Sequence, residues 1–274
     1  MSELESESGN KPKTKILFVF EGINPESQIF EKLSQNYFVD SRSNHIKAIF
    51  GQDIYELYRL LKKENGFRDL LDIIKEKTPD KDKEILEGVL RKHISDIYLV
   101  FDYDGHATKA SDDDLKEMLA YFKEAEPEDE EFDRDNIKLY ISYPMSEAIK
   151  HLKSGINFQD VIVDAKENIN YKNLVSQNCD NIFNQIKKWE LNHWAVIIHE
   201  HCCKLNFVTT NSFAFPNCTF EQLEVFEAQL EKYIIPANKV AVLSAFPVLL
   251  LDYYGAEGLH NKTSSQLTAP QESI

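Results

Sequence analysis

Two aspartates, Asp102 and Asp104, directly follow the apolar run IYLVF at residues 97–101. Such a run is typical of a buried strand, and side chains two apart on a strand point to the same side. Two carboxylates held close together repel each other unless a cation lies between them. The D-x-D spacing at the end of this run therefore predicts a site for a divalent metal ion.

Two further apolar runs end at or shortly before an acidic residue. KILFVF, at residues 15–20, leads directly into Glu21, and IKLYIS, at residues 137–142, is followed five residues later by Glu147. Ligands bind beyond the carboxyl ends of the strands of a parallel α/β sheet. We therefore expect both glutamates at the same edge of the sheet as the two aspartates.

These four acids, Glu21, Asp102, Asp104 and Glu147, are the candidate catalytic residues. Hard oxygen ligands suit Mg²⁺ or Mn²⁺, so Asp102 and Asp104 are predicted to be metal ligands. Glu21 is either a third ligand or a general base.

Each acid also has an ordinary structural interpretation. Asp104-Gly105 is a favourable turn pair, and Glu147 falls in the first turn of a predicted helix, where a carboxylate complements the helix dipole. His106, which follows the turn, is expected to be an exposed residue without a role. The sequence leaves the role of Glu147 open between these two interpretations.

The elements that must position these acids follow an α/β order. Helices predicted over 25–35, 45–64, 68–77 and 82–94 separate the first two strands, and the third strand follows another helix. This alternation predicts a parallel, layered α/β sheet. The predicted domains are an α/β core at 15–164 with a helical insertion at 40–95, and a mainly helical C-terminal lobe at 165–258 in which a strand at 239–244 returns to the sheet. Polar residues 1–14 and 259–274 are expected to be disordered tails.

The composition limits the classes of function. The chain has 274 residues, 42% of them hydrophobic, which is enough for a sizeable core. Its formal net charge is −15. A protein that coats duplex nucleic acid would carry a basic surface, so that class is excluded. A metal-dependent enzyme that meets nucleic acid over a small area remains compatible with the charge.

The four cysteines, Cys179, Cys202, Cys203 and Cys218, form no C-x-x-C pair. We interpret them as reduced thiols of a cytoplasmic protein. The polar N-terminus lacks the apolar segment of a signal peptide. The most apolar stretch, at 240–251, is too short to span a bilayer.

The segment HEHCC, at residues 199–203, contains soft metal ligands. On a helix His199 and His201 face different sides, so a packed helix with His201 in the core is predicted rather than a zinc site. Trp189 and Trp194 are likewise expected in the core, with stacking on a nucleic-acid base as the alternative.

The arrangement resembles the Toprim fold, in which a Glu at the end of the first strand and a D-x-D at the end of a later strand bind Mg²⁺. FVFEG supplies Glu21 and Gly22, and VFDYD supplies Asp102 and Asp104. Residues 15–150 carry the resemblance. The helical insertion, the segment SYPMSEA and the ending LSAFPVLLLDYYG are similar to Toprim nucleases of bacterial anti-phage defence, namely OLD-type and RloB-like proteins and the AriB-like effectors of the PARIS system.

This resemblance implies an Mg²⁺-dependent nuclease effector that cleaves RNA, transfer RNA in the PARIS-like case, or DNA. It implies release of the activity by a partner ATPase; a homodimer would suit a nuclease that needs two sites. Glu21 would be the general base or a ligand, Asp102 and Asp104 ligands, and Glu147 an additional acid. Many such nucleases carry a lysine after the third strand, and Lys150 and Lys153 are the candidates here.

Two other functions fit the same residues. DYDGH, at residues 102–106, is close to the D-x-D-G-T motif of HAD-type phosphatases, in which Asp102 would attack a phosphate and Ser142 would bind it. Against this interpretation, an earlier strand already ends in an acid, and His106 replaces the expected Thr. The other alternative is a non-catalytic module that docks on an ATPase through its acidic surface.

Overall fold

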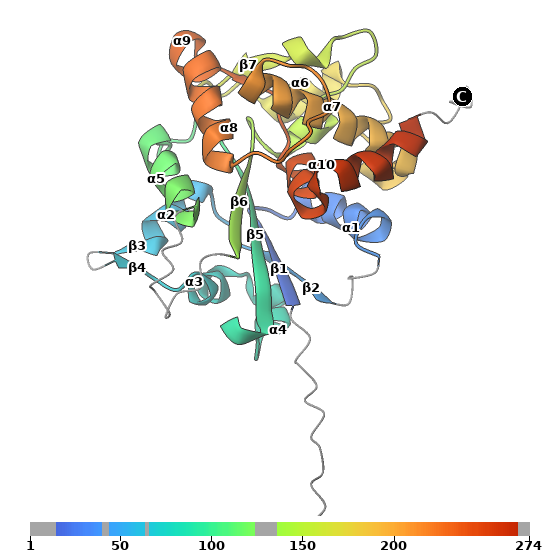
Figure 1. Ribbon diagram of the computed structural model, residues 1–274. Coiled ribbons are helices and arrows are strands. Elements are labelled where there is room, and N and C mark those ends of the chain that lie inside the picture. The colour runs from blue at the N-terminus through green and yellow to red at the C-terminus, as the bar shows by residue number, and fades with distance from the viewer. Residues whose placement is uncertain (1–14, 40–43, 64–65, 124–135, 268–274) are drawn as a thin grey trace, which may run out of the picture.

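A four-stranded parallel sheet forms the centre of the protein (Figure 1). The computed structural model describes residues 15–39, 44–63, 66–123 and 136–267. The strands follow the order β2-β1-β5-β6 and comprise β1 (Lys15–Phe20), β2 (His45–Ile49), β5 (Ile94–Asp102) and β6 (Ile137–Ser142). All three pairings are parallel, so the predicted α/β class with a parallel sheet is confirmed.

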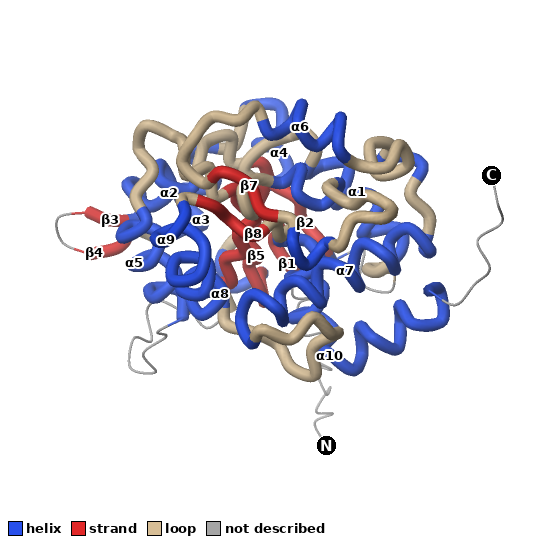
Figure 2. Tube along the Cα trace, turned by 90° about the horizontal axis from the view of Figure 1, so that it is seen from above, coloured by secondary structure: helices blue, strands red, loops and turns tan. Residues whose placement is uncertain are grey.

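The two central strands are apolar over residues 16–20 and 97–101, because helices cover both of their faces there. Phe20 of β1 packs against Phe30 of α1 (Glu26–Asn36) and stacks on Phe246 of α10 (Ala245–Leu267). Phe101 of β5 lies on the opposite face and packs edge-on against Phe50. Viewed from above, the strands occupy the middle of the molecule and helices surround them (Figure 2).

The region between β2 and β6 supplies the helices of this second face. They are α2 (Ile54–Leu61), α3 (Leu70–Lys77), α4 (Asp80–Leu86) and α5 (Asp112–Lys123), with a short hairpin of β3 (Lys62–Lys63) and β4 (Gly66–Phe67) after α2. Helix α5 begins with three aspartates, which its N-terminal dipole favours.

The C-terminal region is mainly helical, as predicted, and lies over the carboxyl ends of the strands (Figure 1). Its longer elements are α6 (Tyr171–Asn178), α7 (Leu191–Thr210), α8 (Gln222–Gln229) and α10, and its shorter ones are η3 (Ser146–Lys150), η4 (Phe158–Asp160) and α9 (Ile235–Ala237). Helix α10 bends at Gly255, whose φ of 70° suits glycine.

The predicted helical insertion at 40–95 needs correction, because it contains the edge strand β2, the hairpin of β3 and β4, and the start of β5. The helix expected at 82–94 ends at Leu86. Residues 45–49 were expected to open a long helix, and they pair with β1 instead. Ile46 and Ile49 fit a helical stripe, but the chain turns at Gly51, where φ is 79°. The Asp53 side chain then accepts a hydrogen bond from the Glu56 N–H at 2.7 Å, so the helix begins only at Ile54.

The predictions for the end of the chain also need correction. The strand expected at 239–244 is shorter, β8 (Lys239–Ala241), and pairs antiparallel with β7 (Ile162–Asp164) rather than joining the parallel sheet. Leu243 forms an isolated bridge with Tyr143 just beyond β6. The tail expected from 259 is helical to Leu267, because Leu259 is buried against the core. Residues 1–14 and 268–274 lie outside the described residues.

A buried lysine ties α7 to the chain that enters β7. The Lys204 ammonium donates to the carbonyl oxygens of Phe158, Gln159 and Val161 at 3.2, 2.5 and 3.0 Å, and its side chain is fully buried. An ammonium group has three protons, and each meets one carbonyl. Lys204 thus fixes the chain that enters β7, while the pairing with β8 holds the strand itself.

We expect Lys204→Met to lower the free energy of unfolding by about 3 kcal/mol, because three buried carbonyls lose their donor. Urea denaturation of the variant measures this change. Exposed Lys187 provides the control, since Lys187→Met should leave the unfolding midpoint unchanged. A loss below about 1 kcal/mol would show that these carbonyls do not depend on Lys204.

Candidate metal centre

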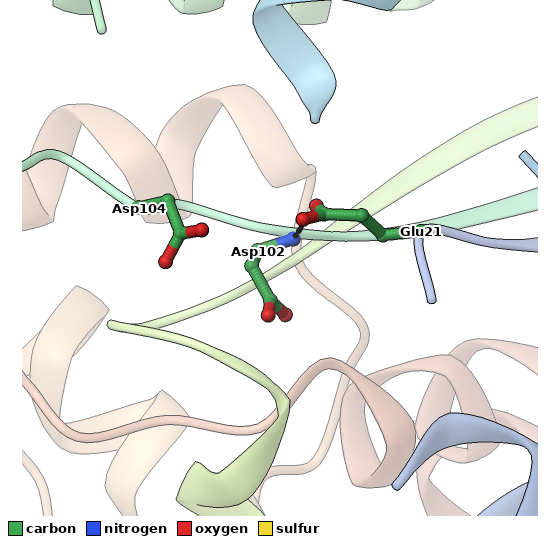
Figure 3. Close-up of side chains that lie close together, drawn as sticks. All are labelled: Glu21, Asp102 and Asp104. Carbon is green, nitrogen blue, oxygen red and sulfur yellow. Dashed lines mark hydrogen bonds between the residues drawn. The ribbon is translucent and has the colours of Figure 1, made fainter. Parts of the chain in front are cut away.

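Glu21 and Asp102 lie side by side at the carboxyl ends of β1 and β5. The Glu21 N–H donates to the Val100 carbonyl at 3.2 Å, which extends the parallel pairing by one residue. The Asp102 N–H in turn donates to Glu21 Oε2 at 3.1 Å (Figure 3). The backbone thus fixes one carboxylate oxygen of Glu21 and leaves the other free of this bond.

Asp104 completes the group in the loop after β5. Its backbone has a φ of 40°, and its N–H donates to the Pro144 carbonyl at 3.1 Å. The side chains of Asp102 and Asp104 project to the same side of the chain (Figure 3). One carboxylate oxygen from each of Glu21, Asp102 and Asp104 lies within 4.8 Å of the other two. We call these three residues the acidic cluster.

Burial makes the negative charges of the acidic cluster costly. It raises the pKa of Glu21 to about 8, an effect that the hydrogen bond from Asp102 opposes and the charge of Asp104 reinforces. Burial, followed by the charge of Glu21, also raises the pKa of Asp102 well above its usual value. The pKa of Asp104 is raised as well, again mainly by burial. A cation placed among the three would offset these costs.

Glu26, which the sequence analysis missed, adds a fourth carboxyl group. It opens α1, is 4% exposed, and its Oε2 has no hydrogen-bond partner among the described residues. Burial raises its pKa, and among neighbouring charges Glu147 contributes most to the increase. Its charge also raises the pKa of both Glu21 and Asp102. An acid at a helix N-terminus is so common that its position gave no signal.

Glu147 lies on η3 beside the acidic cluster and raises the pKa of Asp102 and Asp104 by its charge. Its Oε1 is 3.5 Å from the ammonium of Lys172, at the start of α6. Lys172, which was also missed, is thus a cation next to the carboxylates. Of the lysines considered from the sequence, Lys150 also lies within electrostatic range of Glu147 and Glu26, and burial lowers its pKa. Lys153 lies within electrostatic range of the Cys179 thiol.

The donor set fits a hard divalent cation. It offers carboxylate oxygens and no sulfur or imidazole ligand, which favours Mg²⁺ or Mn²⁺ over zinc. Within the described ranges, three buried oxygens around the centre lack a hydrogen-bond partner: Glu26 Oε2, Asp104 Oδ1 and Glu147 Oε2. Unpartnered buried oxygens of this kind are expected where an ion or its water ligands bind.

Other residues singled out in the sequence have structural positions. Ser142, the phosphate-binding residue of the HAD-type alternative, is fully buried, and its Oγ accepts from the Ala245 N–H at 3.2 Å. His201 is fully buried, as predicted, and its Nδ1 accepts from the Ser244 N–H at 3.2 Å. Trp189 and Trp194 pack edge-on in the core, also as predicted. His106 is exposed but lies close enough to lower the pKa of Asp104.

In the absence of metal, the protein should lose stability as the pH rises from about 5 to about 8. The Glu21 pKa rises from 4.5 to about 8 on folding, so over this range the folded state holds a proton that the unfolded chain has released. Melting temperatures measured in chelator should show this decline. Glu21→Gln cannot ionise and should flatten it, whereas exposed Glu167→Gln should not; equal slopes in all three proteins would contradict this assignment.

Mg²⁺ should raise the melting temperature, because it binds only the folded state; at 100 times its dissociation constant the gain is about 2.7 kcal/mol. The rise should be larger at pH 8 than at pH 6, since protons compete with the ion for the same carboxylates. Asp102→Asn and Asp104→Asn should each abolish the rise. Exposed Asp113→Asn, which removes the same charge elsewhere, should keep it.

Comparisons with protein-family models, with curated proteins and with solved structures each find no match to this chain. Among the helices of the described residues, none combines the length and apolar character needed to cross a membrane. The case for a function therefore depends on the centre itself.

Proposed function

We propose that this chain is an Mg²⁺- or Mn²⁺-dependent nuclease of the Toprim type, which hydrolyses phosphodiester bonds at the acidic cluster. The observation that carries the proposal is the approach of Glu21, Asp102 and Asp104 to within 4.8 Å at the carboxyl ends of two adjacent parallel strands. Carboxylates that only cap turns are not expected to lie together in a buried group, because their negative charges repel one another there.

Asp102 and Asp104 would hold the metal ion. When bound, Mg²⁺ supplies positive charge that stabilises the phosphoryl oxygens during displacement. Glu21 has one oxygen fixed by the Asp102 N–H, and its other oxygen is available either to the ion or to a proton from the attacking water.

Lys172 and Glu147 would act on the substrate side of the centre. The ammonium of Lys172 is exposed and can donate hydrogen bonds to a phosphate oxygen. Its ion pair with Glu147 keeps it beside the acidic cluster. A single local cation of this kind suits a protein whose net charge of −15 opposes extended contact with nucleic acid.

The biological setting follows from the resemblance alone. It favours RNA, transfer RNA in particular, over DNA, and a role in anti-phage defence in which a partner ATPase restrains and releases the nuclease. A homodimer stays a prediction on the same basis. Four free cysteines are consistent with a reducing, cytoplasmic compartment.

Purified protein should cleave transfer RNA, single-stranded RNA or duplex DNA with Mg²⁺ or Mn²⁺ and not with chelator. Glu21→Gln and Asp102→Asn should lower the rate at least about 100-fold, because each removes a group that acts in the transition state. Lys172→Met should lower it about tenfold, the loss of one charged phosphate contact. Asp113→Asn is the matched control.

Two results would contradict the proposal. Cleavage at the parent rate by Glu21→Gln would mean that another protein is responsible. An acid-labile phosphate on Asp102 after incubation with a phosphomonoester would instead support the HAD-type phosphatase.

A further inference from the structure

A pocket of about 170 Å³ opens beside the acidic cluster. It lies between the loop after β5, the segment after β6 and residues 164–172, which connect β7 to α6. Its inner wall is apolar and largely buried, with Pro144, Ala165 and Ile169 among its residues. Its outer part is polar and exposed, with Asn168 and Asn170.

The pocket and the metal centre share a wall. Pro144 lines the pocket, and its carbonyl accepts the Asp104 N–H at 3.1 Å. His106 and Lys172 also line the pocket, and the Lys172 ammonium lies 3.5 Å from Glu147 Oε1. A ligand in the pocket would therefore lie beside the Lys172 ammonium and beside the loop that carries Asp104.

Gly105 permits this close arrangement. A Cβ on Gly105 would lie 2.7 Å from the Ala165 carbonyl oxygen and would also collide with the Tyr103 ring. The loop that carries Asp104 can therefore approach the wall formed by Ala165 only because residue 105 has no side chain.

The chemistry of the pocket matches one flat heterocycle. Its volume is below the range of about 300–1,000 Å³ of pockets that hold larger ligands. An apolar wall contacts the faces of such a ring, and asparagine amides, which donate and accept hydrogen bonds, can contact its edge. Two acids also line the pocket: Asp164, which pairs with the Lys239 ammonium at 2.5 Å, and Glu167, which is exposed at the outer part.

We propose that this pocket receives the base of an unpaired nucleotide adjacent to the scissile phosphodiester. The inference rests on the proposed nuclease function and specifies its substrate as single-stranded or locally unpaired nucleic acid. His106 and Lys172 then lie where the phosphate of that nucleotide would pass into the metal centre. A base within a duplex would first have to leave its stack, which costs free energy that an unpaired base does not require.

The net charge of −15 supports the same substrate. Duplex binding draws most of its affinity from many phosphate contacts, which need an extended basic surface. Insertion of one base needs only a fitted pocket and a local cation, and the pocket and Lys172 supply them here.

The test uses Met145, which is half-buried in the pocket and outside the metal centre. Met145→Trp fills the pocket with a larger side chain, and Met145→Leu is the volume-matched control. Both variants should keep the Mg²⁺-induced rise in melting temperature, which verifies the fold and the metal site. Any variant that loses the rise is replaced by Ile169→Phe, paired with Ile169→Val.

Binding and cleavage are measured on fluorescent oligonucleotides that are unpaired, fully paired, or unpaired with one abasic position. Binding is measured with Ca²⁺ and cleavage with Mg²⁺. The parent should bind and cut the unpaired strand at least about tenfold better than the duplex, as expected when one base contributes a substantial contact. Met145→Trp, and an abasic site next to the cut, should each remove about tenfold, and Met145→Leu should not.

The binding and cleavage assays together separate the proposed base pocket from the proposed nuclease activity. Metal-dependent cleavage that ignores pairing, abasic sites and Met145→Trp would overturn the base pocket and leave the nuclease in place. Base-dependent binding without any cleavage would overturn the nuclease and leave the pocket as a nucleotide-binding site. Absence of both binding and cleavage would overturn both.

Discussion

Repulsion between carboxylates that the fold holds close together is the constraint on which the rest of the structure depends. The pairing of β1 with β5 brings Glu21 and Asp102 together, and the chain cannot separate them without breaking it. In the loop after β5, the bond from the Asp104 N–H to the Pro144 carbonyl holds Asp104 beside them. Glu26 and Glu147 intensify the repulsion. The apolar sheet beneath, with aromatic side chains packed on both faces, supplies the stability that holds this group in place.

The C-terminal region forms the surroundings of that group. Leu243 and Tyr143 exchange two backbone hydrogen bonds, of 2.8 and 3.0 Å, and thereby close the chain beyond β6. Lys204 fixes the segment that enters β7, and the loop after β7 provides the outer wall of the pocket. A mainly helical region distant in sequence therefore determines what can reach the carboxylates, while the sheet determines where the carboxylates are.

The sequence predicted the strands and the acids at their ends best where the local hydrophobic pattern allows only one secondary structure, and where that structure is also the one present in the folded protein. The continuous apolar runs of β1, β5 and β6 have one sensible interpretation, and the acids at their ends follow from the topology. The error at β2 arose because Ile46 and Ile49 suit both a helix and a strand, and only pairing with β1 decides between them. Glu26 and Lys172 could not be predicted, since their importance depends on contacts with Glu147, far away in the chain.

The stacking of Phe20 on Phe246 has a consequence for how the protein is made. The face of the sheet that carries Phe20 is covered only in part, by α1, until the ribosome has translated α10, more than 140 residues after Asp104. At about 5–20 residues per second, this delay is on the order of ten seconds. During that interval the nascent chain has its acids but lacks the helix that completes their support.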